Sequence, residues 1–112
     1  MKPRLLAILL AAAALPASAQ VPGGLELFVR ADKGYCIACH QLPAGVGPAT
    51  RADIGPPLGG PRIRELGRER VRQLLEDPTT VNAQTVMPPY GKHRILDKAE
   101  LDALVRFLDA LP

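Results

Sequence analysis

The segment Cys36-Ile37-Ala38-Cys39-His40 contains both cysteines of the chain and one of its two histidines. The two thiols stand three positions apart, so one helical turn brings them to the same face, and the imidazole follows directly. This arrangement attaches haem covalently, because the thiols add to the two vinyl groups at one haem edge and the histidine ligates the iron. The sequence therefore predicts one haem c per chain, bound through Cys36 and Cys39, with His40 as an axial iron ligand.

Two other uses of a C-x-x-C pair fit this chain less well. A thioredoxin-like redox pair follows a strand in a βαβ unit, and no such pattern precedes Cys36. A tetrahedral zinc site needs four ligands, from a chain that has only two cysteines and two histidines. Covalent haem attachment is the interpretation that the context of the motif favours.

The N-terminal segment has the pattern of a secretory signal peptide. Lys2 and Arg4 precede an uncharged apolar run over residues 5–15, and Ala17-Ser18-Ala19 has the form of a cleavage site. An uncleaved membrane anchor is the alternative, but the uncharged stretch is shorter than the ~20 residues that span a bilayer. We expect a signal peptide over 1–19, a mature domain over 20–112, a periplasmic location and no membrane attachment after cleavage.

Removal of the signal peptide changes the charge balance. The formal net charge of +3 includes Lys2 and Arg4, so the mature chain keeps 12 basic and 11 acidic side chains, a net charge of +1. Neither this balance nor any interleaving of aromatic and basic residues suggests a nucleic-acid partner. The chain has no Trp, two Phe and two Tyr, so a buried porphyrin would supply much of the core of so small a domain. The haem-free chain is therefore expected to fold poorly.

Helical patterns recur along the chain, and no segment has the alternation of a strand. The spacing of Leu25, Phe28 and Val29 predicts an N-terminal helix over residues 25–35, with Gly34 allowing a close approach near its end. Residues 41–60 are rich in Gly and Pro, which predicts an irregular segment wrapped around a haem edge.

Residues 62–76 predict two short helices, or one helix broken at Gly67, and Asp77-Pro78 ends the second. The arginines of this segment are expected to form a solvated face, with a partner-docking patch as the alternative. They are Arg62, Arg64, Arg68, Arg70 and Arg72.

The last helix has the clearest local signals. Asp97 and Glu100 predict a capping box, and Leu96 and Leu101 occupy the positions of a hydrophobic staple. An apolar stripe continues the helix to about Leu111. It consists of Leu101, Leu104, Val105 and Leu108.

Met87 is the expected second axial ligand. It is the only methionine of the mature chain, and Pro88 and Pro89 stiffen the loop directly after it. His93 is the alternative and would give a bis-histidine haem of lower potential, whereas Lys33 and Lys92 are candidates only at high pH. Two protein ligands leave no open coordination site, so the chain is expected to transfer electrons and not to bind oxygen or peroxide.

The order of these elements resembles that of class I cytochromes c, over nearly all of the mature chain. The resemblance implies an all-α fold in which the first and last helices cross, with short middle helices and long loops around a covalently bound haem. Gly55-Pro56-Pro57-Leu58 matches an element in which a proline carbonyl accepts the Nδ1–H of the haem histidine. Pro56 is therefore the expected partner that orients His40.

Three stretches resemble the SoxX family, the small cytochrome subunits of SoxAX sulfur-oxidation complexes. They are residues 52–58, Asp77-Pro78 with Asn82, and residues 85–91. The resemblance implies a heterodimer with a SoxA-like haem subunit, which joins thiosulfate to a cysteine of a sulfur-carrier protein. This chain would not be catalytic alone, but would be the electron-transfer subunit of an L-cysteine S-thiosulfotransferase complex.

In that role the chain would pass the released electrons to a soluble cytochrome c. The alternative function is a freestanding periplasmic cytochrome c that carries electrons between respiratory complexes. A permanent subunit should expose a larger apolar patch around the haem than a carrier does. Candidate residues for that patch are Val46, Ile54, Pro56, Pro57, Pro89 and Tyr90.

Overall fold

The computed structural model describes residues 1, 13–15 and 20–112, so the predicted signal peptide lies largely outside the described residues. The described part contains helices and no strand. The α-helices are α1 (Gly24–Val29), α2 (Gly60–Leu66), α3 (Arg68–Glu76) and α4 (Lys98–Asp109), and the 3₁₀ turns are η1 (Cys36–Ala38) and η2 (Pro78–Thr80). This confirms the predicted all-α class. None of the described helices is long and apolar enough to cross a bilayer.

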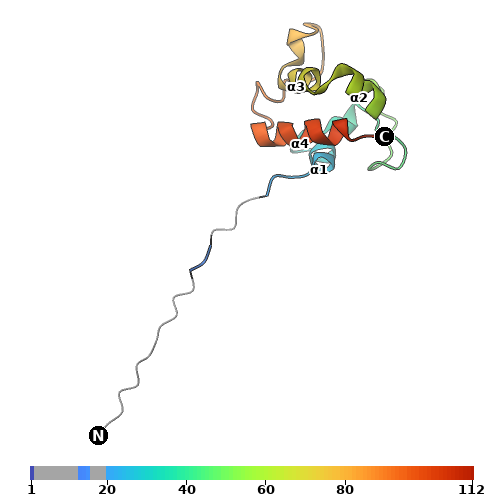
Figure 1. Ribbon diagram of the computed structural model, residues 1–112. Coiled ribbons are helices and arrows are strands. Elements are labelled where there is room, and N and C mark those ends of the chain that lie inside the picture. Colours follow the sequence, from blue (N-terminus) through green and yellow to red (C-terminus); the bar gives the residue numbers. More distant parts are fainter. Residues whose placement is uncertain (2–12, 16–19) are drawn as a thin grey trace.

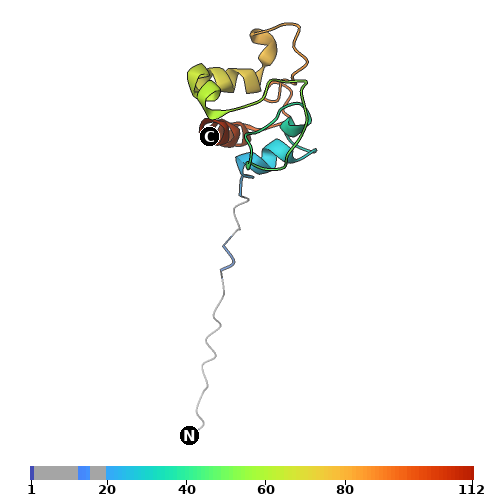
Figure 2. The same cartoon turned by 90° about the vertical axis from the view of Figure 1, so that its right-hand side faces the viewer.

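Helix α4 is the centre of the fold, with α1 on one side and α2 and α3 on the other (Figures 1 and 2). Its predicted apolar stripe is fully buried, and Leu104 is completely inaccessible to solvent. Phe28 of α1 packs against Phe107 of α4, with the ring centroids 6.0 Å apart. Gly24 permits this contact, because a Cβ at that position would overlap Phe107. The packing of the first helix on the last is thus as expected.

The N-terminal helix is shorter than predicted. Helix α1 ends at Val29, and the chain turns through residues 31–34 where the prediction continued the helix to Tyr35. The amide of Gly34 returns to the carbonyl of Leu27 at 3.1 Å, and a Cβ on Gly34 would lie 2.9 Å from that oxygen. The predicted close approach at Gly34 is therefore real, but it serves a chain reversal and does not lie in a helix.

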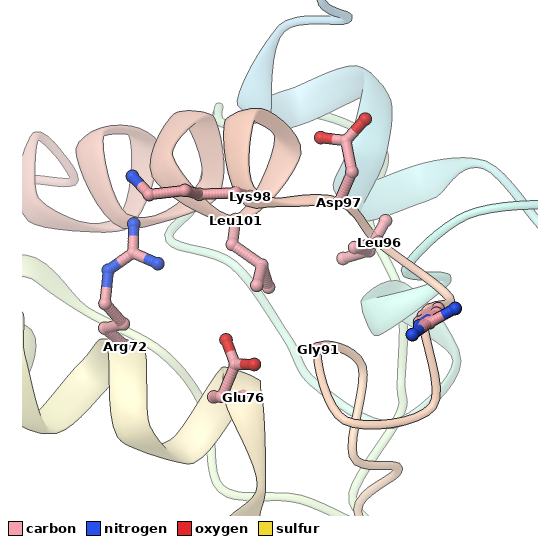
Figure 3. Close-up of a pocket in the computed structure, with 8 residues that line it drawn as sticks. Arg72, Glu76, Gly91, Leu96, Asp97, Lys98 and Leu101 are labelled. Atoms are coloured by element: carbon pink, nitrogen blue, oxygen red, sulfur yellow. The ribbon is translucent and has the colours of Figure 1, made fainter.

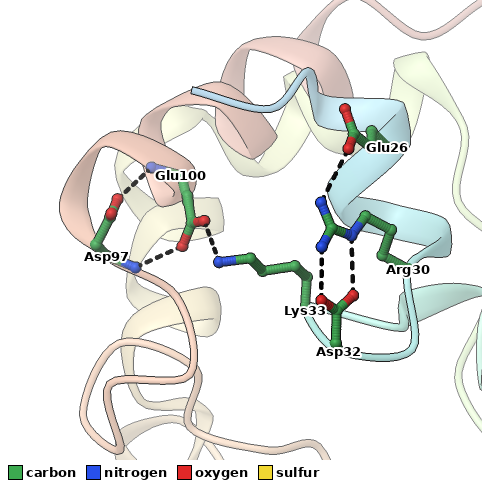
Figure 4. A network of polar contacts seen from close by, with 6 residues as sticks. All are labelled: Glu26, Arg30, Asp32, Lys33, Asp97 and Glu100. Carbon is green, nitrogen blue, oxygen red and sulfur yellow. Dashed lines mark hydrogen bonds and ion pairs between the residues drawn. The ribbon is translucent and has the colours of Figure 1, made fainter. Parts of the chain in front are cut away.

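The capping box of α4 is present as predicted and carries an additional ion pair. Asp97 accepts a hydrogen bond from the Glu100 amide at 2.8 Å, and Glu100 accepts one from the Asp97 amide at 2.9 Å. The same Glu100 carboxylate, 5% exposed, also accepts from Lys33 Nζ at 2.6 Å (Figure 4). This bond raises the pKa of Lys33. The turn that follows α1 is thereby fastened to the start of α4.

The same view contains a second, exposed cluster in which Arg30 pairs with Glu26 and Asp32 (Figure 4). Because these groups are open to water, the cluster contributes little to stability. Helix α4 ends at Asp109, two residues before the predicted limit near Leu111.

The middle helices break at Gly67 and end before Asp77-Pro78, as predicted. Gly67 has φ +84°, a conformation that favours glycine. The arginines are less uniform than expected, because several of them bind the C-terminal segment. Arg64 donates to the carbonyls of Asp109 and Leu111, while Arg68 pairs with the Asp109 carboxylate.

Arg72 pairs with Asp102 of α4. Only Arg62 and Arg70 bond solely to neighbours on their own helix within the described residues. The arginine face that is predicted to be solvated therefore also forms hydrogen bonds and ion pairs with α4 and the residues after it.

Candidate haem site

The Cys-x-x-Cys-His motif lies on η1 and the residue after it, directly behind the turn that follows α1. Tyr35 enters it with φ +47°, a left-handed conformation, and the His40 amide donates to the Cys36 carbonyl at 2.9 Å. Cys36 is buried, and burial raises the pKa of its thiol to about 12. Cys39 and His40 are half-buried. The local fold therefore gathers both thiols and the imidazole into one tight turn.

The irregular segment 41–59 lies beside the motif. The Gly55 amide donates to the Cys39 carbonyl at 2.8 Å, and the Leu58 amide donates to the Gln41 carbonyl at 2.9 Å. These bonds bring the Pro56 carbonyl within 2.7 Å of His40 Nδ1. Gly55 packs closely against the imidazole and leaves no room for a side chain, because a Cβ there would be 2.3 Å from His40 Cε1. A ring that donates its Nδ1–H to Pro56 leaves Nε2 free to ligate a metal.

An apolar cavity of about 450 Å³ opens beside His40. Its wall contains Cys36 and residues from all four α-helices, and except for Cys36, His40 and Arg62 the lining consists of apolar side chains, glycine and proline. Such a wall suits a large flat apolar group, and its volume lies in the range of cofactor sites. The arrangement fits a porphyrin that is held at one edge by thioethers and ligated on its face by an imidazole.

Met87 lies on the wall of this cavity together with His40, and it is half-buried. His93, the alternative second ligand, is exposed and does not line the cavity. The two lysines considered for high pH are both engaged in ion pairs, Lys33 with Glu100 and Lys92 with Asp77 at 3.1 Å. Of the candidates for the second position, Met87 is the one that shares the cavity with His40.

A second cavity of about 440 Å³ lies between α3, the turn before α4 and the start of α4. Figure 3 shows the charged ends of Arg72, Glu76 and Lys98 around it, with Leu101 at its wall. None of the predicted haem residues lines it. Its charged rim makes it a poor host for an apolar macrocycle, which leaves the cavity beside His40 as the candidate haem site.

Tyr90, a candidate for the apolar patch around the haem, is buried with 7% of its surface accessible. Burial and, to a smaller extent, the nearby Cys36 and Cys39 raise the pKa of Tyr90 to about 12. Its carbonyl accepts hydrogen bonds from the Ile95 and Leu96 amides at 2.9 and 3.1 Å, so Tyr90 anchors the turn before α4. Its position after two prolines gave no signal that it belongs to the core.

Together, the helical fold, the Cys-x-x-Cys-His turn and the apolar cavity behind it define a c-type cytochrome domain. A comparison with family models agrees, since residues 19–108 match the family described as cytochrome c oxidase, cbb3-type, subunit III. The chain belongs to this family, and a c-type cytochrome domain carries covalently bound haem c. No curated protein matches the chain.

Among solved structures, the chain is similar to one described as the crystal structure of SoxXA from P. pantotrophus. The alignment covers 80% of this chain and 82% of that chain, with a TM-score of 0.65 and 22% sequence identity. The two chains therefore share a fold over most of their lengths. This agrees with the class I cytochrome c architecture expected from the sequence.

Proposed function

We propose that this protein is a periplasmic monohaem cytochrome c that serves as the electron-transfer subunit of a SoxAX-like complex. The observation that carries the proposal is the cavity with His40 and Met87 on its wall, in a fold shared with a chain of a SoxXA structure. The signal-peptide pattern over residues 1–19 supports export, which brings the cysteines into the compartment where a SoxAX-like complex would work.

The haem supplies one-electron chemistry through its iron. Cys36 and Cys39 would hold it by thioether bonds, which would prevent its dissociation. The Pro56 carbonyl keeps the His40 ring in one tautomer and one orientation, and Met87 supplies a soft thioether from a loop stiffened by the two prolines after it. The apolar wall excludes water. With His40 and Met87 as its iron ligands, the haem would transfer electrons without binding small ligands.

The sulfur chemistry of such a complex has to reside in the partner. The chain contains no cysteine besides Cys36 and Cys39, and both would be used in haem attachment. A SoxA-like haem subunit would therefore conjugate thiosulfate to the cysteine of a sulfur-carrier protein, in an L-cysteine S-thiosulfotransferase reaction. This chain would accept the released electrons and pass them to a soluble cytochrome c.

Two exposed apolar side chains lie close in sequence to residues that line the cavity and suit a docking face for the partner. Ile54 is 67% exposed two residues before Pro56, and Val86 is 80% exposed next to Met87. Pro56 and Met87 both line the cavity, so a partner that covers Ile54 and Val86 would approach the haem closely. Exposed apolar groups at such a position are typical of protein interfaces.

Co-expression with a SoxA-like haem protein tests the proposal. A stable heterodimer is expected on size-exclusion chromatography, and Val86→Asp should weaken it by placing a charge in the buried contact. Val81→Asp is the control, since Val81 is also exposed, at 40%, but neither of its chain neighbours lines the cavity. A chain that stays monomeric in the presence of the partner would instead support the freestanding carrier.

The ligand assignment has its own test in the visible spectrum. Methionine ligation gives oxidised haem c a weak charge-transfer band near the red end, and Met87→His should abolish it. The reduced protein should also fail to bind carbon monoxide at neutral pH. Absence of the band in the wild-type protein, or rapid carbon monoxide binding, would contradict ligation by Met87.

A further inference from the structure

The residue after the predicted cleavage site is a glutamine. Cleavage after Ala17-Ser18-Ala19 would make Gln20 the first residue of the mature chain and give it a free α-amine. The side-chain amide of a glutamine is spaced to react with the α-amine of the same residue, because the product is an unstrained five-membered lactam ring. Both reactants would then belong to one residue, which makes the reaction unimolecular and favours it strongly over attack by a separate amine.

The structure leaves Gln20 accessible for this reaction. Gln20 is exposed and lies in the irregular segment that precedes α1. The Gly23 carbonyl, which accepts from the Leu27 amide at 3.0 Å, is the first backbone group within residues 20–112 with a recorded hydrogen bond. Ring closure at Gln20 would therefore break no backbone hydrogen bond recorded in that range and would displace no buried side chain.

The charge near the new terminus favours an uncharged end. Val21 and Pro22 line a cavity of about 340 Å³ together with Arg106 and Phe107 of α4. Among the described residues that line it, Arg106 alone is charged, and no ion pair of Arg106 is recorded within residues 20–112. An α-ammonium on the residue before Val21 would add a second positive charge close to this cavity, and like charges disfavour the protonated amine.

We propose that Gln20 of the mature protein is cyclised to pyroglutamate. The neutral α-amine attacks the side-chain carbonyl carbon Cδ, so a bond forms between N and Cδ while the bond between Cδ and Nε2 breaks and ammonia leaves. An ordinary α-amine has a pKa of about 8, so roughly a tenth of it is the neutral nucleophile at pH 7. The reaction is neither an oxidation nor a reduction and needs no cofactor. Its product has a lactam in place of the charged amine.

The modification would protect the N-terminus. Proteolysis concentrates at chain termini, and a lactam offers no α-amine for an aminopeptidase to bind. The segment at risk leads directly into α1, where Gly24 packs against Phe107. The inference rests on one part of the proposed function, namely export with cleavage after Ala19, and is independent of any SoxA-like partner.

Mass spectrometry of the haem-loaded protein, freshly isolated from the periplasm, tests the proposal. Trypsin should release residues 20–30 as one peptide, in which Gln20 is the only side-chain amide. This peptide should be lighter by one ammonia than its unmodified sequence. N-terminal sequencing should be blocked until pyroglutamyl aminopeptidase removes residue 20.

Gln20→Asn is the matched control, because it keeps the amide but has one methylene fewer, and its cyclisation would need a strained four-membered ring. Its peptide should keep the full mass, and an aminopeptidase should remove residue 20 from this variant but not from the wild-type protein. A synthetic peptide of residues 20–30 carried through the same digestion should also keep its full mass.

The outcomes separate cyclisation from cleavage. A wild-type peptide that begins at Gln20 with its full mass would overturn cyclisation and leave cleavage after Ala19 intact, whereas an N-terminus elsewhere would contradict the cleavage site and the proposal with it. An equal loss of ammonia in Gln20→Asn or in the synthetic peptide would also overturn the proposal. If Gln20→Asn is not exported, the comparison of the wild-type and synthetic peptides decides the question.

Discussion

Replacement of Gly55 by alanine should displace the imidazole of His40, the predicted haem ligand, without changing that residue itself. A Cβ at this position would lie 2.3 Å from His40 Cε1 and 2.7 Å from both ring nitrogens, where ordinary contacts begin near 3.4 Å. Gly55 cannot retreat freely, because its amide is bonded to the Cys39 carbonyl. The imidazole therefore has to move by about 1 Å to reach ordinary van der Waals separation.

That movement breaks the hydrogen bond between His40 Nδ1 and the Pro56 carbonyl, which is 2.7 Å long in the structure. A hydrogen bond of this kind is worth about 1 kcal/mol. The carbonyl increases the basicity of the imidazole and thus favours oxidised iron, so its loss should raise the reduction potential. If the whole 1 kcal/mol distinguishes the two oxidation states, the rise is about 40 mV for a one-electron couple.

Redox titration of the haem-loaded Gly55→Ala protein measures this shift. Gly23→Ala is the matched control, because it adds the same methyl group outside the cavity, where no atom lies within 4 Å. Gly23 also has φ −65°, which alanine adopts without strain. A Gly55→Ala potential equal to that of Gly23→Ala would refute the view that Pro56 tunes His40 through this contact.

Three further predictions concern stability. Glu100→Gln should lower the free energy of unfolding of the haem-loaded protein by about 2 kcal/mol in guanidinium titrations, because it breaks the partly buried pair with Lys33. The exposed control Glu69→Gln should change this free energy by less than about 0.5 kcal/mol. Equal losses would contradict this view of the pair. Since the pKa of Lys33 is raised by Glu100, the stability it contributes is complete below the ordinary lysine pKa and is lost as pH rises through the raised value. The loss of stability at alkaline pH should therefore be smaller in Lys33→Met than in the wild-type protein. Identical alkaline unfolding curves for the two proteins would contradict this role of Lys33. The haem-free chain should unfold without a cooperative thermal transition, and a sharp calorimetric peak would show that the protein core suffices without the porphyrin.

The elements whose signals are local could be predicted from the sequence. The capping box of Asp97 and Glu100, the break at Gly67 and the stop at Asp77-Pro78 each depend on residues within one or two turns, and all are present. The Cys-x-x-Cys-His motif is equally local. Its ligand roles remain predictions, although His40, Pro56 and Met87 do meet around one cavity.

The features that depend on distant contacts could not be predicted in this way. Helix α1 ends early because Gly34 returns to the Leu27 carbonyl, a chain reversal that helical periodicity does not encode. Tyr90 is buried and Arg62 reaches the cavity because of how α2, α3 and the turn before α4 pack together. The hydrogen bond of Arg64 and the ion pair of Arg68 with Asp109 join residues more than 40 positions apart, and no local sequence pattern predicts such contacts.

The wall of the cavity depends on a segment that is synthesised well after the haem-attachment motif. The Gly60 amide donates to the Pro112 carbonyl at 2.8 Å, and Arg64 holds the Leu111 carbonyl at 2.9 Å, so residues 111–112 fasten the start of α2. His40 precedes Pro112 by 72 residues. A chain that emerges N-terminus first therefore presents its two thiols and imidazole on an open segment long before the wall can close. Biogenesis then has a natural order, in which the cofactor is joined to an accessible peptide and the polypeptide subsequently folds around it.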